Sequence, residues 1–339
     1  MIIDIQRYWG DVEIYHVGEL CAKIIEGMKQ DGTVTLRTKE HRSCVANGGY
    51  RLLDELSSYY KWDKSKIILE TPSNTEHHSE YTVIRIPDYN AGTFKIPPTT
   101  PDWNKEKFYG LFIGRASASR IRAIQNHINF KHRDMGIASF HDNLMTYNDR
   151  FELSNYFVQT NQRWSDIKDI RPFSDIDATH SVPIIPGIND QLAIWNSAYQ
   201  KIAIEIICET STRPDCFTRS EKLLRCITYK RPFLLVGARN TVHDFKIQES
   251  YDGKKFNLKS FSNIIDESYD EYDGTDRVDM IFKELDRLIS SGKIYTLIDD
   301  CKEILEHNYH LVKDHINSSK KLATTDIWYN YFDKKNWYQ

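Results

Sequence analysis

The chain alternates short apolar runs with segments of helical periodicity, and this alternation limits its fold more than any other feature. Apolar runs at 32–38, 66–71 and 81–86 have the length and composition of buried strands. A helical pattern at about 17–30 precedes the first run, and another at 49–60 separates the first two. Strands that alternate with helices predict a parallel sheet with helices packed on its faces.

A stretch with four prolines, 86–103, reads as a loop or linker, and the alternation continues after it. Three further apolar runs predict strands, and four further segments predict helices. The strands are expected at 108–114, 202–208 and 232–237, and the helices at 116–128, from 185, at 220–230 and over 290–316. The last of these helices carries an apolar face through Leu297, Ile298, Cys301, Ile304, Leu305 and Leu311.

A chain of 339 residues is too long for one ordinary core, so two domains are expected. We predict two α/β halves with a cleft between them. The first comprises residues 1–104, and the second comprises 105–315, with a boundary anywhere between 105 and 150. The aromatic-rich tail 316–339 is expected to pack back on the first domain.

Composition indicates a soluble globular protein, with 40% hydrophobic and 27% charged residues. The longest apolar runs are near seven residues, whereas a membrane span needs roughly 20, so we expect no span. The N-terminus lacks the layout of a secretory signal, which favours the cytoplasm. The six cysteines are far apart and form no C-x-x-C motif, which favours reduced thiols over disulfides or a zinc site.

The net charge of −3 argues against a general nucleic-acid-binding surface, but the charge is unevenly distributed. Residues 105–133 contain seven basic residues and one acidic residue, a local charge of +6. The basic residues are Lys105, Lys107, Arg115, Arg120, Arg122, Lys131 and Arg133.

The segment 208–237 places charges between a buried strand and the helix that follows it. Glu209 ends the strand, Arg219 and Ser220 precede the helix, and Ser220 is a candidate N-cap. Glu221 and Lys222 then fall in the first helical turn, where a cation is unfavourable unless an anion is also bound. Lys222 and the helix end could share a phosphate, and Glu221 could accept bonds from two ribose hydroxyls. The alternative is a capping box or a surface ion pair.

These residues carry a resemblance to a known family. The runs F-T-R-S-E-K-L-L-R-C and K-R-P-F-L-L-V-G resemble the donor-site signature of the α1,3-fucosyltransferase type of GT-B glycosyltransferase. The run L-F-I-G-R-A-S-A-S-R is similar to the segment that opens the second domain of that family, where an arginine reaches the donor diphosphate. Residues 264–270 and Arg277 are similar to glycosyltransferase-like proteins of tailed phages. The resemblance covers about 105–290.

The resemblance implies a fold and a donor site. The fold would be two Rossmann-like domains facing a central cleft. Glu221 would bind the donor ribose, while Lys222 and Arg120 would bind the diphosphate, with Arg115 as the second candidate. No metal or bound cofactor would be needed, because a nucleotide-sugar is the co-substrate. The sequence departs from the fucosyltransferases in its first half, where the acceptor and the base would lie.

A base without a metal would come from the first domain, within hydrogen-bond reach of the acceptor hydroxyl. Glu40 and His41 follow the strand at 32–38, and Glu76 follows the next strand, beside His77 and His78. We favour Glu40, and a solvated loop residue is the alternative for each.

Other motifs point elsewhere but fit less well. Asp175-Ile176-Asp177 matches the D-x-D of metal-dependent GT-A glycosyltransferases, but no apolar strand precedes it. His141 and Asp142 could act together as a catalytic base, or His141 could be a loop histidine whose hydrogen bonds are satisfied. No G-x-G-x-x-G, Walker loop or G-x-S-x-G occurs, so dehydrogenase, nucleotide-hydrolase and α/β-hydrolase functions lack support.

Two function classes remain. The first is a glycosyltransferase that moves a sugar from a UDP- or GDP-sugar to an acceptor hydroxyl. Its acceptor could be a hydroxymethylated pyrimidine of double-stranded phage DNA, with Lys105, Lys107, Lys131 and Arg133 on the backbone phosphates. A surface polysaccharide or a protein is the alternative acceptor. The second class is a non-catalytic module that binds a nucleotide or glycan. The sequence does not reveal the sugar, the stereochemical outcome or the oligomeric state.

Overall fold

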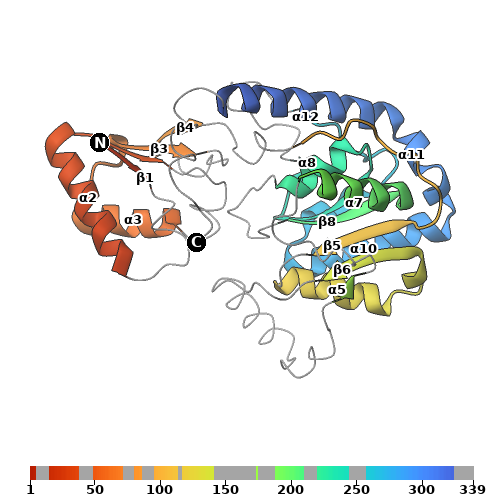
Figure 1. The fold of residues 1–339 in the computed structure, drawn as a ribbon. Coiled ribbons are helices and arrows are strands. Elements are labelled where there is room, and N and C mark those ends of the chain that lie inside the picture. The colour runs from red at the N-terminus through yellow and green to blue at the C-terminus, as the bar shows by residue number, and fades with distance from the viewer. Residues whose placement is uncertain are drawn as a thin grey trace.

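The computed structural model describes residues 1–4, 15–37, 49–71, 80–85, 95–113, 117–140, 173–174, 188–209, 220–243 and 257–323. Within these ranges the protein is an α/β protein with two parallel sheets, each with a hydrophobic core of its own (Figure 1).

The first sheet has four parallel strands in the order in which they occur along the chain. The strands are β1 (Ile2–Asp4), β2 (Val34–Arg37), β3 (Ile67–Thr71) and β4 (Thr82–Arg85). Helices α2 (Tyr15–Asp31) and α3 (Gly49–Tyr60) contribute to the core, where Leu20, Ile24 and Leu53 pack with the strands. Two βαβ crossovers therefore build this unit.

The second sheet has the order β7-β6-β5-β8-β9, and its strand order reverses direction at β5. The strands are β5 (Tyr109–Ile113), β6 (Gly136–Phe140), β7 (Phe173–Ser174), β8 (Ile204–Cys208) and β9 (Phe233–Val236). Only β7, among these five, is antiparallel to its neighbour. Because β6 lies on one side of β5 and β8 on the other, the topological switch point is between β5 and β8.

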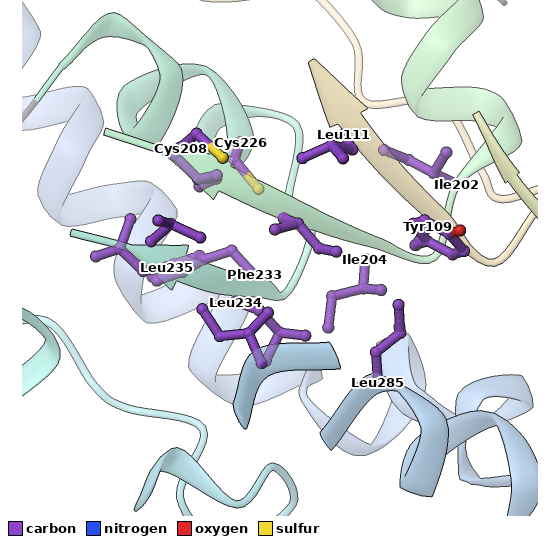
Figure 2. Close-up of a cluster of buried hydrophobic side chains, with 14 of the residues drawn as sticks. Tyr109, Leu111, Ile202, Ile204, Cys208, Cys226, Phe233, Leu234, Leu235 and Leu285 are labelled. Atoms are coloured by element: carbon purple, nitrogen blue, oxygen red, sulfur yellow. The ribbon is translucent and has the colours of Figure 1, made fainter. Parts of the chain in front are cut away.

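Six α-helices of the second unit fall within the described residues. They are α5 (Ala118–Asn129), α7 (Ile188–Lys201), α8 (Glu221–Thr228), α10 (Gly274–Ser290), α11 (Leu297–Asp300) and α12 (Lys302–Ala323). Helix α5 connects β5 to β6, and α8 connects β8 to β9. Figure 2 shows side chains of β5, β8 and β9 in the core, with Leu285 of α10 packed below them.

Every residue of β5, β6, β8 and β9 is buried, as expected of strands covered on both faces. The apolar runs at 108–114, 202–208 and 232–237 are therefore confirmed as strands, and those at 32–38, 66–71 and 81–86 are confirmed in the first sheet. The helices predicted at 17–30, 49–60, 116–128 and 220–230 are also confirmed.

One predicted helix was wrong in extent. The segment 290–316 is not one helix, because Gly292 follows α10 in a left-handed conformation with φ of 73°. A 3₁₀ turn (Lys293–Tyr295) and α11 come next, and α12 begins only at Lys302. The apolar residues predicted for the segment 290–316 do face the core, since Leu297, Cys301 and Leu305 are buried in it.

Two segments near the predicted domain boundaries pack with the second core. Ile96 and Trp103 contact it, and the Trp103 indole Nε1 donates to the Lys107 and Lys201 carbonyls at 2.8 and 3.0 Å. At the other end, α12 continues past residue 315, and Ile316 is buried in the same core.

Two further observations concern side chains and helices in the described ranges. Cys21, Cys208, Cys226 and Cys301 are free thiols and buried, as expected, while Cys44 and Cys216 lie outside these ranges. None of the helices that the structure describes combines the length and apolar character needed to cross a membrane.

Candidate functional site

The carboxyl ends of β5 and β8 meet at the topological switch point, and a helix begins near each of them. Helix α5 begins after its N-cap, Ser117, whose side chain makes no capping hydrogen bond. Helix α8 begins after its N-cap, Ser220. Helix N-termini carry unsatisfied N–H groups and partial positive charge, so this edge of the sheet favours an anion.

Arg120 connects the start of α5 to the end of β8 at this edge. It belongs to the first turn of α5, and only 4% of its surface is exposed. Its Nη2 donates to the backbone carbonyl of Glu209, directly after β8, at 2.8 Å. The predicted proximity of Arg120 to the 208–222 segment is therefore present in the structure, although 89 residues separate the two partners in sequence.

The Glu209 carboxylate is also buried, and it fixes the start of α8. Its Oε1 accepts a hydrogen bond from the Ser220 backbone N–H at 3.2 Å. The Ser220 Oγ in turn accepts from the Lys222 N–H at 3.2 Å, which confirms Ser220 as the N-cap. Local sequence explains this arrangement, because a serine with extended backbone geometry stands directly before the first helical residue.

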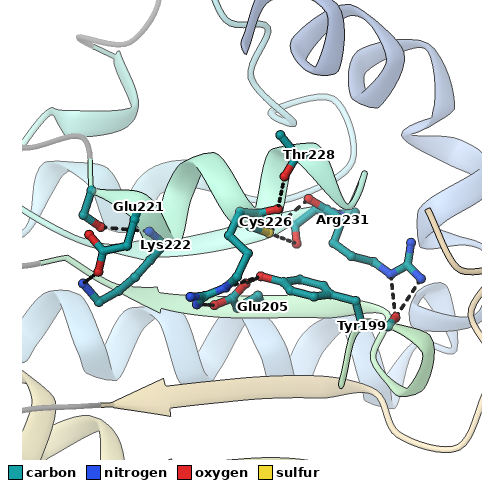
Figure 3. Close-up of polar contacts among 10 residues, drawn as sticks. Tyr199, Glu205, Glu221, Lys222, Cys226, Thr228 and Arg231 are labelled. Carbon is teal, nitrogen blue, oxygen red and sulfur yellow. Dashed lines mark hydrogen bonds and ion pairs between the residues drawn. The ribbon is translucent and has the colours of Figure 1, made fainter. Parts of the chain in front are cut away.

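Lys222 brings a second, partly buried cation to the same edge. Its side chain is 15% exposed, and Nζ pairs with Glu221 Oε1 at 3.1 Å (Figure 3). Burial lowers the pKa of Lys222, the Glu221 carboxylate opposes this effect, and the positive charge of Arg120 adds to it. The ammonium is therefore held at a cost that a bound anion would relieve.

Cys208, the last residue of β8, lies close to both cations. Burial raises the pKa of its thiol to about 12, and Arg120 and Lys222 act in the opposite direction. A thiol with such a pKa is protonated at neutral pH, so Cys208 is a packing residue and not a nucleophile.

A buried polar network behind this edge was missed by the sequence interpretation. Glu205 of β8 accepts from Tyr199 Oη in a short hydrogen bond and from Arg225 Nη2 at 3.3 Å. The Arg225 guanidinium also lies over the Trp195 ring, 3.6 Å from its centroid. Figure 3 shows Glu205 and Tyr199 together beneath α8. A charged residue inside the strand IAIEIIC was the signal available in the sequence.

Arg277, which belongs to the region with the phage-like resemblance, has a structural role in the fold. It is fully buried in α10, where Nε donates to the Leu235 carbonyl at 2.7 Å and Nη2 pairs with Asp270 at 2.7 Å. Asp270 also accepts from the backbone N–H groups of Val242 and His243. These bonds attach α10 to the carboxyl end of β9 and leave no role for Arg277 in contact with a ligand.

Several predicted site residues lie outside the described residues. They are Glu40, His41 and Glu76 of the first half, Arg115 and Arg219 of the donor segments, and Asp175, Asp177, His141 and Asp142. Their roles stay predictions.

The cations proposed for a DNA backbone are not brought to the switch point. Lys105 and Lys107 precede β5, and Lys131 and Arg133 precede β6, so all four lie toward the amino ends of the strands. Lys131 pairs with Asp286 of α10 at 2.7 Å, and Lys107 donates to the Asp134 carbonyl at 2.6 Å.

Arg122 is engaged in the same way, because it makes two hydrogen bonds of 2.7 Å to Asp279 of α10. Two of the cations of residues 105–133, Arg122 and Lys131, are therefore paired with carboxylates of α10.

A groove of about 860 Å³ lies elsewhere on the second unit, between residues 257–264 and 299–304. Phe261 contacts Phe233, the first residue of β9, so this groove is at the amino end of the sheet. It holds no residue of the switch-point site.

No group of three or more metal-binding side chains is present among the described residues. No family model matches the sequence, and no curated protein or solved structure matches it either. The functional assignment therefore depends on the geometry of the switch point and on the resemblance of the 208–237 segment.

Proposed function

We propose that this protein is a glycosyltransferase that binds a nucleotide-sugar at the switch point between β5 and β8. One observation carries the proposal: Arg120, Glu209, Ser220 and Lys222 converge there from two helices and one strand end. Open α/β sheets bind ligands at this position, outside the carboxyl ends of the strands.

Each group has a role in the proposal. Lys222 and the N-termini of α5 and α8 bind the diphosphate, since all supply positive charge at one edge. Arg120 reinforces this charge from its buried position. Glu221 accepts hydrogen bonds from the ribose hydroxyls in this proposal, which its exposure supports, since 41% of its side chain is exposed. Glu209 positions Arg120 and Ser220 through its carbonyl and its carboxylate.

We further propose that the two α/β units form a GT-B arrangement with the acceptor side on the first. Transfer would proceed as the acceptor hydroxyl attacks the anomeric carbon, the bond from that carbon to the diphosphate breaks, and a base of the first unit takes the proton. The positive groups at the switch point would stabilise the leaving diphosphate.

A carbohydrate or protein acceptor is favoured over duplex DNA. Lys107, Arg122 and Lys131 are engaged within the fold, and Lys105, Lys107, Lys131 and Arg133 lie toward the opposite end of the strands from the proposed donor. A sugar-nucleotide consumption assay over UDP- and GDP-sugars tests the proposal. Turnover supports a transferase, whereas tight nucleotide binding without turnover would indicate a non-catalytic module.

A further inference from the structure

The C-terminal end of α3 presents an exposed aromatic cluster, which we call the aromatic turn and define as Tyr59, Tyr60 and Trp62. Tyr59 is 80% exposed and Tyr60 is 42% exposed. The other large hydrophobic side chains exposed in the described part of the chain, Ile2, Tyr272 and Tyr295, are isolated in sequence. Isolated exposed apolar residues are ordinary, but adjacent exposed rings indicate an interaction surface.

The three rings hold one another in a defined arrangement. Tyr60 stacks on Trp62, with centroids 5.1 Å apart and planes 11° apart, and Tyr59 meets Tyr60 edge to face at 4.9 Å. Trp62 packs against the core of the first unit. The outer rings therefore rest on an anchored inner ring, and little side-chain freedom remains to be lost when a ligand binds.

Lys61, which lies between Tyr60 and Trp62, has an unusual backbone conformation. The Trp62 N–H donates to the Ser57 carbonyl at 2.9 Å, which closes the helix end, and Lys61 takes a left-handed conformation with φ of 55°. Glycine is the usual residue at such a position, since a side chain costs roughly 1 kcal/mol there. The chain keeps an exposed lysine beside the rings despite this cost.

A hydrogen-bond network beneath the rings holds the turn in place. Lys64 donates to Asp54 Oδ1 at 2.9 Å and to Glu80 in a short bond, and Tyr81 Oη donates to Asp54 Oδ1 at 2.7 Å. These contacts connect α3 to the residues before β3 and β4. These contacts hold the aromatic turn in one arrangement.

The net charge around the aromatic turn and its exposed area indicate which kind of ligand it binds. Residues 54–66 carry three basic and three acidic residues, a net charge of zero, so a polyanion such as nucleic acid gains little there. Three partly exposed rings offer at most a few hundred Å², well below the ~800 Å² per partner of a stable protein interface. A neutral oligosaccharide fits both limits, because the C–H face of a pyranose packs on the electron-rich face of an aromatic ring.

We propose that the aromatic turn is a carbohydrate-binding surface separate from the transfer site. Helix α3 has 12 residues, about 18 Å in length, and it runs from the carboxyl end of β2 to the amino end of β3. The surface is therefore at the opposite end of the first sheet from the segments that follow β2 and β3. It would hold a sugar polymer away from the reacting hydroxyl.

The test is calorimetric titration of the full chain, without nucleotide, with maltohexaose, cellohexaose and β-1,4-mannohexaose. At least one should bind, and Tyr59→Ala and Tyr60→Ala should each weaken that binding by about two- to tenfold. Tyr272→Ala, which removes an exposed tyrosine of the second unit, is the matched control and should change nothing. Both test positions are exposed, and the thermal unfolding midpoint of each variant verifies its fold.

Three results would overturn the proposal: binding of none of the three sugars, unchanged binding in both tyrosine variants, or a loss of equal size in Tyr272→Ala. Tighter, strongly salt-dependent binding of a ten-residue oligothymidylate would assign the surface to nucleic acid instead. Concentration-dependent dimerisation abolished by Tyr59→Ala would assign it to self-association. The donor site is not involved in this titration, so a negative result leaves the transferase proposal unaffected.

Discussion

At the scale of single residues, Lys222 is the group most closely tied to the proposed function. Its side chain is partly buried beside Arg120 and pairs with the neighbouring Glu221, and burial lowers its pKa although the carboxylates of Glu221 and Glu209 act in the opposite direction. A bound diphosphate would supply the missing negative charge.

We expect Lys222→Ala to weaken UDP or GDP binding by about 1.5–3 kcal/mol, or roughly ten- to hundredfold, with little loss of stability. Arg120→Ala should weaken binding too, but it should also destabilise the fold because it removes the bond to Glu209. Calorimetric titration and urea unfolding of both variants separate the two effects. Equal affinity in Lys222→Ala and the wild type would place the diphosphate elsewhere.

The lowered pKa of Lys222 predicts a pH dependence of nucleotide binding. The ammonium is charged below its folded-state pKa, and affinity should fall as pH rises through that value, which lies below that of ordinary lysine. Stability should change in the opposite direction, because a depressed lysine pKa makes the folded state gain stability as pH rises through it. In Lys222→Arg the charge persists, so the alkaline loss of affinity should disappear from the titration curve.

At the scale of elements, the strands were predictable because fully buried parallel strands are continuous apolar runs. β6 was missed since its sequence, GIASF, has one branched aliphatic residue and three small ones. Helix α10 was also missed, although Val278, Ile281, Phe282 and Leu285 show helical spacing and are buried. The N-cap Ser220 was predicted from local chemistry. The ion pairs that Arg122 and Lys131 make with carboxylates of α10 could not be predicted in this way, because more than 150 residues separate the partners in sequence.

The close approach of the Tyr109 ring explains why β6 begins with a glycine, Gly136. A Cβ at this position would come within 2.3 Å of the Tyr109 ring, which is buried and hydrogen-bonded to His127. Gly136→Ala should therefore destabilise the second unit by about 1–3 kcal/mol through overpacking. Chemical denaturation measures this, with Gly18→Ala in α2 as the control, since nothing lies within 4 Å of a Cβ there.

The Glu205–Arg225 pair predicts strong coupling between β8 and α8. Arg225→Met should destabilise the protein by about 3–5 kcal/mol, because it leaves Glu205 buried without its charge partner. Combining it with Glu205→Leu should recover much of that loss. A double-mutant cycle by urea unfolding gives the coupling, and additive effects of the two changes would show that the pair does not interact in solution.

At the scale of the whole molecule, the α/β class with parallel sheets was predicted correctly from the alternation of apolar runs and helical segments. The residues proposed for the donor side could be selected because they lie near strand ends and helix starts, where local sequence is informative. The acceptor side could not, since Glu40, His41 and Glu76 lie outside the described residues.

We expect sugar transfer to be independent of divalent metal, because Arg120, Lys222 and two helix N-termini already supply positive charge for the leaving diphosphate. Activity should persist in excess EDTA. Loss of activity with EDTA and recovery with Mn²⁺ would redirect attention to Asp175 and Asp177.

The central claim is that the switch point between β5 and β8 binds the diphosphate of a nucleotide-sugar. Its most direct test is calorimetric titration of the full chain with UDP and GDP, in the wild type and in Lys222→Ala, with Lys283→Ala on exposed α10 surface as the control. The account predicts saturable binding of one nucleotide, weakened at least about tenfold by Lys222→Ala and unaffected by Lys283→Ala. Binding of neither nucleotide, or equal affinity in all three proteins, would contradict it.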